Sequence, residues 1–150
     1  MSKKILAVDD EPSILALIER ALAGRGYEII TGVDGYDAVD KARLHQPDLI
    51  ILDIMMPNMN GLDAARQIES DPKTAKIPVM LLSGVGDLDK QLDALEELNV
   101  EYLTKPFKQA ELAEFVDALL DPSLRDQLEK HRRHQIGKLR ALVEIMHRAE

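Results

Sequence analysis

The stretch Leu49-Ile50-Ile51-Leu52-Asp53 joins four aliphatic residues directly to a carboxylate. Three other short runs that are largely apolar also end on polar residues: Ile5–Val8 before Asp9 and Asp10, Val79–Leu82 before Ser83, and Val100–Thr104 before Lys105 and Pro106. If the runs are parallel strands, these polar residues converge at the carboxyl edge of the sheet, where ligands of such sheets bind. Three carboxylates, a hydroxyl and an ammonium at one place suit a metal ion and a phosphoryl group.

Helical patterns separate the four runs. The sequence predicts helices from Pro12 to just before Gly24, over about 35–45, from about Leu62 to 71, over about 87–98 and over about 108–120, with one further strand at 27–31. Strands that are apolar on both faces belong inside a sheet covered by helices on both sides. Right-handed crossovers then give a doubly wound α/β fold, although periodicity alone does not fix the strand order.

Composition limits the classes of protein to consider. A chain of 150 residues builds one domain with a substantial core, and the absence of Cys excludes disulfides and thiolate metal sites. The N-terminus lacks the pattern of a signal peptide, and no run approaches membrane-spanning length, so we expect a cytoplasmic protein without a membrane partner.

Charge is distributed unevenly along the chain. The net charge is −8, yet residues 121–150 contain seven basic and five acidic residues. The excess of acid therefore lies in residues 1–120, whose negative charge would repel nucleic acid. We accordingly do not expect nucleic acid as a partner.

The residues at the strand ends suggest a definite chemistry. A carboxylate such as Asp53 can attack phosphorus and form an acyl phosphate. Because nucleophile and phosphoryl group are both anionic, the site needs a hard cation, and Asp9 and Asp10 offer the oxygen ligands that Mg²⁺ prefers. Lys105 and Ser83 could each donate a hydrogen bond to a phosphoryl oxygen.

With these residues in this order, residues 3–120 resemble the receiver domain of bacterial response regulators in two-component systems. The resemblance rests on the pair Asp9-Asp10, the stretch Asp53-Ile54-Met55-Met56-Pro57 followed by Gly61, Ser83, and Lys105-Pro106. It implies a flavodoxin-like, five-stranded parallel sheet in the order 2-1-3-4-5. It also implies that Asp53 accepts a phosphoryl group from a histidine kinase or a phosphotransfer protein in a phosphorelay.

The resemblance also assigns roles around Asp53. Asp10, Asp53 and the backbone carbonyl of Met55 would bind Mg²⁺ directly, and Asp9 would act through water. The peptide bond between Lys105 and Pro106 would be cis.

A switch is implied as well. On phosphorylation, the Ser83 hydroxyl would move toward the new oxygens and Tyr102 would turn inward. The face formed by the last two helices and the fifth strand would then change shape for protein–protein signalling. Met55 and Val85 flank the acyl phosphate and cannot hold an attacking water, so we predict slow self-dephosphorylation.

Two other functions remain open at this point. Phosphatases of the haloacid dehalogenase type also use a nucleophilic Asp, Mg²⁺ and a Lys, but they need a second Asp two residues beyond the nucleophile. Here Met55 follows Asp53 at that spacing, so we expect no enzyme beyond the chain's own phosphorylation and dephosphorylation. A receiver with an inactive site, acting only as a binding module, is the other alternative.

The tail forms a separate unit in this interpretation: residues 1–120 make the receiver and residues 121–150 a helical extension. Asp121 is a candidate helix cap before Pro122, and residues 123–149 predict one long helix. Its apolar stripe comprises Leu124, Leu128, Ile136, Leu139, Leu142, Val143 and Met146, interrupted by Arg132 and Gln135. The helix could form a homodimer, connect to an output domain, fold back on the body or bind a downstream protein. We expect the basic run 131–134 to be a solvated face.

Overall fold

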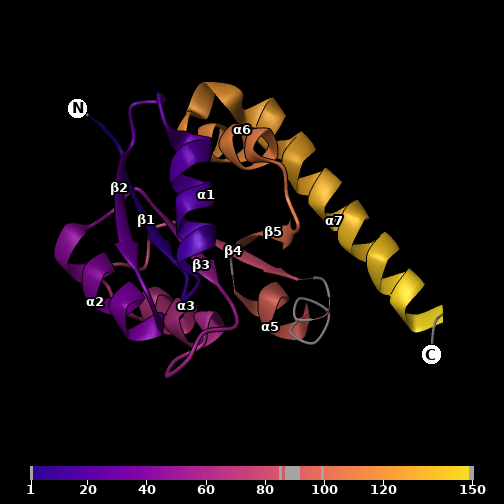
Figure 1. Ribbon diagram of the computed structural model, residues 1–150, viewed down its shortest axis with the longest axis horizontal. Coiled ribbons are helices and arrows are strands. Elements are labelled where there is room, and N and C mark those ends of the chain that lie inside the picture. Colours follow the sequence, from indigo (N-terminus) through magenta and orange to yellow (C-terminus); the bar gives the residue numbers. More distant parts are fainter. Residues whose placement is uncertain (1, 85, 87–91, 99, 149–150) are drawn as a thin grey trace.

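The structure is a computed structural model that describes residues 2–84, 86, 92–98 and 100–148. Strands and helices alternate along the chain, and a long helix follows them (Figure 1). The elements are β1 (Lys4–Val8), α1 (Pro12–Leu22), β2 (Glu28–Gly32), α2 (Gly35–His45), β3 (Leu49–Asp53), α3 (Gly61–Ser70), β4 (Val79–Gly84), α5 (Leu92–Glu97), β5 (Glu101–Lys105), α6 (Gln109–Leu120), the 3-10 turn η1 (Pro122–Leu124) and α7 (Arg125–Arg148). The predicted helix over 87–98 is present from Leu92, and its earlier part lies outside the described residues.

The sheet has the strand order β2-β1-β3-β4-β5, and all four pairings are parallel. This confirms the flavodoxin-like order that the resemblance implied. In register, Val8 pairs with Leu52, Asp53 with Leu82, and Ser83 with Thr104. The strands therefore end at one level, and the polar residues that follow them share one edge of the sheet.

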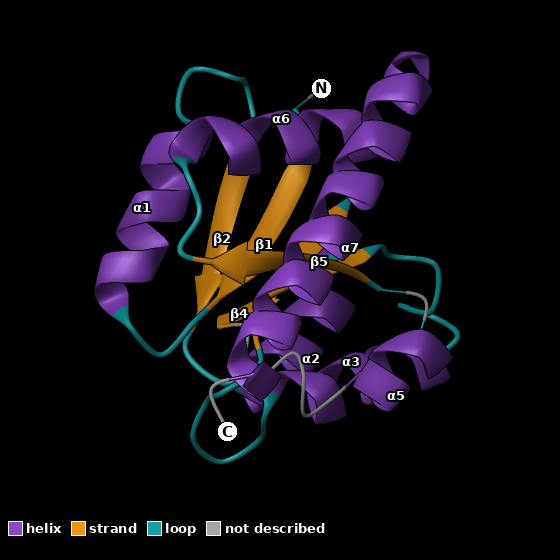
Figure 2. Cartoon of the chain, turned by 90° about the vertical axis from the view of Figure 1, so that its right-hand side faces the viewer, coloured by secondary structure: helices purple, strands orange, loops and turns teal. Residues whose placement is uncertain are grey.

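Two apolar layers sandwich the sheet. Along β1, Leu6 and Val8 face one layer, and Ile5 and Ala7 face the other. Helices α1 and α6 pack beside each other over one face, while α2, α3 and α5 belong to the opposite layer (Figure 2). All five residues of β3 are buried, which explains why its sequence is a continuous apolar run.

Several helices begin with the local chemistry that is typical of helix N-termini. Pro12 is the first residue of α1, and the side chains of Asp34 and Asn60 cap α2 and α3 by accepting hydrogen bonds from Asp37 N and Asp63 N. Asp121 caps η1 in the same way, as predicted, with Ser123 N donating to its carboxylate at 3.0 Å.

The tail is helical as predicted, and α7 folds back on its own chain. It crosses the outer edge of the sheet in front of β5 and contacts α6 (Figures 1 and 2). Leu139 is only 3% exposed, and Leu128 and Val143 pack against the two core layers. Among the residues that the structure describes, no helix is both long and apolar enough to cross a membrane.

Candidate functional site

The carboxyl edge of the sheet brings together the residues that the sequence singled out. Asp9 follows β1, Asp53 ends β3, Ser83 lies near the end of β4 and Lys105 ends β5. Asp9 is 1% exposed and Asp53 is 4% exposed, so both carboxylates are withdrawn from solvent. Lys105 Nζ lies 3.3 Å from Asp9 Oδ2 and 3.5 Å from Asp53 Oδ2 and partly neutralises both.

Four acidic residues form a tight cluster here. Single carboxylate oxygens of Asp9, Asp10, Glu11 and Asp53 all lie within 4.8 Å of one another. Hard oxygen donors in this number fit Mg²⁺, which favours carboxylates and retains several waters. Glu11 was not predicted, although its place two residues after Asp9 could have suggested it. Its backbone N–H donates to Asp9 Oδ1 at 2.9 Å and fixes that carboxylate.

Burial dominates the electrostatics of the cluster. It raises the pKa of Asp53 to about 6, against the opposing effects of the Lys105 ammonium and the Met55 backbone N–H. Burial also raises the pKa of Asp9, against the Glu11 backbone N–H and Lys105. Two buried carboxylates whose ionised forms are disfavoured would gain from a bound divalent cation, and this is a second indication that the site suits one.

The loop after Asp53 folds closely over the end of β3. Gly61 N donates to the carbonyl of Ile54 at 2.8 Å, and a Cβ at Gly61 would overlap the backbone carbonyl of Asp53. Only glycine therefore fits where α3 begins. The Met55 side chain is 59% exposed beside this loop.

The loop between β2 and α2 contacts the loop that follows Asp53, and the sequence did not predict this contact. Asn58 Nδ2 donates to Asp34 Oδ2 at 3.1 Å, and Gly35 N donates to Met59 O at 3.2 Å. Asn58 adopts a left-handed backbone with φ 70°, a conformation that Asn tolerates better than most residues. The turn after β2 thus holds the loop that carries Met55.

The remaining predicted residues lie on β4 and β5. The bond between Lys105 and Pro106 is cis, as expected. Ser83 is buried and follows Leu82, the residue that pairs with Asp53. Tyr102 lies three residues before Lys105, is paired with Leu81 and lines the cleft beside α7. Tyr102 is therefore placed beside α7, apart from the carboxylate cluster. Val85 lies outside the described residues.

The phosphatase alternative finds no support in this geometry. The position two residues beyond Asp53 carries the exposed, apolar Met55, which cannot act as a general acid.

Comparison with known proteins supports a signalling function. The profile of the response regulator receiver domain matches residues 5–117. The alkaline phosphatase synthesis transcriptional regulatory protein PhoP of Bacillus subtilis is 38% identical over 120 residues, or 80% of this chain and 49% of that protein. The DNA-binding dual master transcriptional regulator RpaA of Synechocystis is 36% identical over 129 residues, or 85% of this chain and 54% of that protein.

A solved structure agrees in fold. The receiver domain of sensor histidine kinase PA1611 from Pseudomonas aeruginosa, with a magnesium ion coordinated in its active-site cleft, superposes with a TM-score of 0.72 at 29% identity. The match covers 80% of this chain and 98% of that one.

The curated relatives also bear on partners. This chain spans about half the length of PhoP and RpaA, and both are named as regulators of transcription. Our expectation that nucleic acid is not a partner, which came from the charge of residues 1–120, is therefore not supported, because RpaA is named as DNA-binding. The profile match, the strand order and the clustered carboxylates agree, and the chain belongs to the response regulator receiver domain family of phosphorylation-activated signalling proteins.

Proposed function

We propose that Asp53 is the phosphoacceptor of this receiver and that a histidine kinase or a phosphotransfer protein supplies the phosphoryl group. The observation that carries the proposal is the position of Asp53: a buried carboxylate at the end of the central strand, 3.5 Å from Lys105 and clustered with Asp9 and Asp10. A surface carboxylate without these neighbours would repel an incoming phosphoryl group.

The transfer follows from these positions. A carboxylate oxygen of Asp53 forms a bond to phosphorus while the bond from phosphorus to the donor nitrogen breaks, and the nitrogen keeps the electron pair. Lys105 donates to a phosphoryl oxygen, and the Ser83 hydroxyl donates to another.

Asp10, Asp53 and the Met55 carbonyl are the proposed direct ligands of Mg²⁺, with Asp9 acting through water. When bound, the cation neutralises the charge of the carboxylates and of the phosphoryl oxygens. Movement of Ser83 and Tyr102 would then carry the signal to the face that β5 and its flanking helices α5 and α6 form.

Phosphorylation by a small-molecule donor tests the proposal directly. We expect the full chain to gain one phosphoryl group from acetyl phosphate in Mg²⁺ buffer, detected by intact-mass spectrometry, and to lose this ability in EDTA. Asp53→Asn should abolish the gain. Asp40→Asn, which changes an exposed acid on α2, should not. A phosphorylated Asp53→Asn protein would refute the assignment of the acceptor.

We further propose that Met55 slows self-dephosphorylation. Its exposed, apolar side chain beside Asp53 offers no hydrogen bond to an attacking water. Met55→Asn supplies an amide there and should shorten the lifetime of the acyl phosphate about tenfold. The measurement is the decay of phosphorylated protein after removal of the donor, with Met55→Leu as the matched apolar control. Equal decay of all three proteins would contradict this role.

The proposed organisation is a receiver at residues 1–120 and a helical extension at residues 121–150, acting in the cytoplasm. The proposed output is contact with a downstream protein or output domain, or a homodimer. Arg132 and Lys138 of the extension form ion pairs with Glu101 and Glu111. These pairs reduce the basic charge that the docked helix offers to other partners. Because PhoP and RpaA are named as transcription regulators, DNA binding by a longer protein is compatible with this proposal.

A further inference from the structure

Helix α7 covers the free edge of the sheet. The strand order leaves β5 with a neighbour, β4, on one side only. On the other side, Gln135 of α7 is buried at 2% exposure, with its Oε1 accepting a hydrogen bond from Thr104 N at 3.3 Å and its Nε2 donating to Glu111 Oε2 at 3.3 Å. A helix side chain thus satisfies a backbone donor that a sixth strand would otherwise take.

Charge complementarity holds the same contact. Arg132 donates through Nε to Glu101 Oε1 at 2.8 Å and also through its terminal nitrogen. Further along the helix, His134 Nε2 and Lys138 Nζ lie 3.4 and 3.9 Å from carboxylate oxygens of Glu111. The basic side of α7 therefore faces acidic residues on β5 and α6.

Apolar contacts complete the docking. His131 stacks on Phe115 of α6 with ring centroids 5.4 Å apart, and Leu139 is buried against the core. We call this set of contacts, made by residues 131–139 of α7 with β5 and α6, the α7 interface. The predicted solvated face at 131–134 is thus wrong for His131 and Arg132, which pack against the body.

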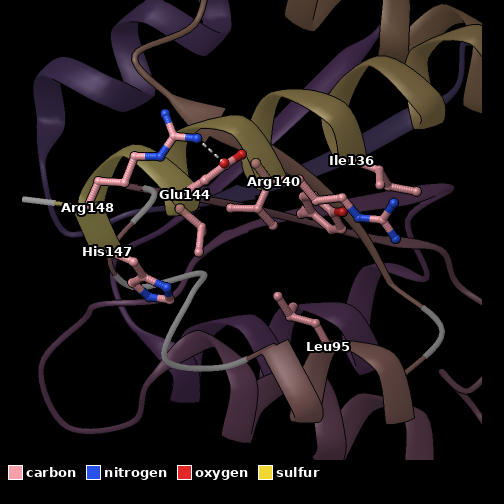
Figure 3. A pocket seen from close by; sticks show the side chains of 9 residues that line it. Leu95, Ile136, Arg140, Glu144, His147 and Arg148 are labelled. Atoms are coloured by element: carbon pink, nitrogen blue, oxygen red, sulfur yellow. Dashed lines mark hydrogen bonds and ion pairs between the residues drawn. The ribbon is translucent and has the colours of Figure 1, made fainter.

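Toward the C-terminal end of α7, a cleft lies between the helix and the body. This cleft of about 680 Å³ lies between this part of the helix and α5, and its lining includes Leu95, Tyr102, Val143 and His147 (Figure 3). Glu144 and Arg148, which also line the cleft, form an ion pair with each other along the helix (Figure 3). Among the described residues, the contacts of α7 with β5 and α6 named above all belong to the α7 interface.

Residues of the α7 interface bind the backbone on both sides of Lys105, at the end of β5. Thr104 N, on one side of Lys105, bonds to Gln135, while the carbonyl of Pro106, on the other side, accepts from Lys138 Nζ at 3.4 Å. Lys105 itself reaches Asp9 and Asp53. Thr104 also pairs in register with Ser83. A shift of the β5 backbone at Lys105 would therefore change the hydrogen bonds that Thr104 and Pro106 make with α7.

We infer that α7 is a displaceable occupant of the β5–α6 face, and that its docking and the phosphorylation of Asp53 oppose each other. This inference rests on the proposed function of Asp53. A phosphoryl group places new anionic oxygens farther from the strand than the carboxylate, and Lys105 follows them. The bonds from Thr104 to Gln135 and from Lys138 to Pro106, at 3.3 and 3.4 Å, are already long and are lost with a small shift.

Hydrogen–deuterium exchange on the full chain tests the first half of the inference. Beryllofluoride with Mg²⁺ serves as the mimic of the acyl phosphate. We expect it to slow exchange in peptides of the loop after Asp53 and to speed exchange in peptides covering 131–143 by roughly fivefold. Faster exchange in α7 should be absent in Asp53→Asn. Unchanged or slower exchange in α7, with the loop protected, would overturn the inference while leaving the proposed function intact. No protection anywhere would overturn both.

The coupling must be reciprocal, and variants test the second half. Leu139→Ala should loosen α7 and raise the apparent affinity for beryllofluoride roughly fivefold. Ile145→Ala, on the exposed side of the same helix, should change neither the exchange rate of α7 nor the affinity for beryllofluoride. Arg132→Gln removes the pair with Glu101 without opening a cavity and should act in the same direction as Leu139→Ala. Loosened helices with unchanged affinity in both variants would refute the coupling.

Discussion

Asp53 combines a buried position with a proposed function that requires its ionised form. Because burial raises its pKa to about 6 from an ordinary 3.8, the folded protein binds the proton more tightly than the unfolded chain does. The contribution of this proton binding to the free energy of unfolding is fully present below the pKa of Asp53 in the unfolded chain. It is lost as the pH rises through the pKa in the folded protein. In Mg²⁺-free buffer, the free energy of unfolding therefore falls as the pH rises from about 4 to 6 and stays lower above that range. Burial of Asp9 acts with the same sign.

The variant Asp53→Asn has no ionisable group at this position, so it should lack this pH dependence of stability. In EDTA at pH 7.5, the variant should exceed the parent in free energy of unfolding by about 1–3 kcal/mol, and the difference should shrink toward pH 4. Urea denaturation followed by circular dichroism at both pH values measures this. Asp40→Asn is the control for loss of one negative charge at an exposed position. A difference independent of pH would show that burial of the charge is not its cause.

At the scale of elements, the turn from β3 into α3 is fixed by glycine. A Cβ at Gly61 would overlap the backbone carbonyl of Asp53, and backbone atoms cannot move aside without shifting the strand end. Gly61→Ala should therefore cost about 3 kcal/mol of stability and weaken Mg²⁺ binding, measured by urea unfolding and by calorimetric titration.

The matched substitution lies in α7. Gly137 has nothing within 4 Å of an added Cβ and sits inside a helix, so Gly137→Ala should raise stability by up to about 1 kcal/mol. Equal effects of the two substitutions would contradict the steric argument for Gly61.

The sequence allowed prediction of the elements better than of their contacts. Asp9, Asp53, Ser83 and Lys105 could be placed together because each lies at or next to the end of a strand and parallel strands end at one edge. The brace from Asp34 to Asn58 could not be predicted, because it depends on two loop conformations that no periodicity encodes. Gln135 looked like a break in an apolar stripe. Its burial depends on Thr104 and Glu111, 31 and 24 residues away, which a local pattern cannot reveal.

At the scale of the whole molecule, the docked tail determines which surfaces are available for assembly. Leu139 and the β5 edge are surfaces that a dimer could use, and in this structure Leu139 is buried against the core while Gln135 bonds to the β5 edge within one chain. Ile136 and Ile145 remain exposed on α7, but two separated side chains are a small apolar surface compared with what a stable interface buries.

We therefore predict that the full chain is a monomer of 16.8 kDa by light scattering in Mg²⁺ buffer. Beryllofluoride should raise the molar mass, because release of α7 frees its apolar residues and the unpaired edge of β5 together. Asp53→Asn, in which the mimic has no acceptor, should remain a monomer throughout. A dimer before the mimic is added would mean that α7 exchanges between chains rather than folding back. A mass that stays constant while α7 is released would instead assign the freed β5–α6 face to a different protein.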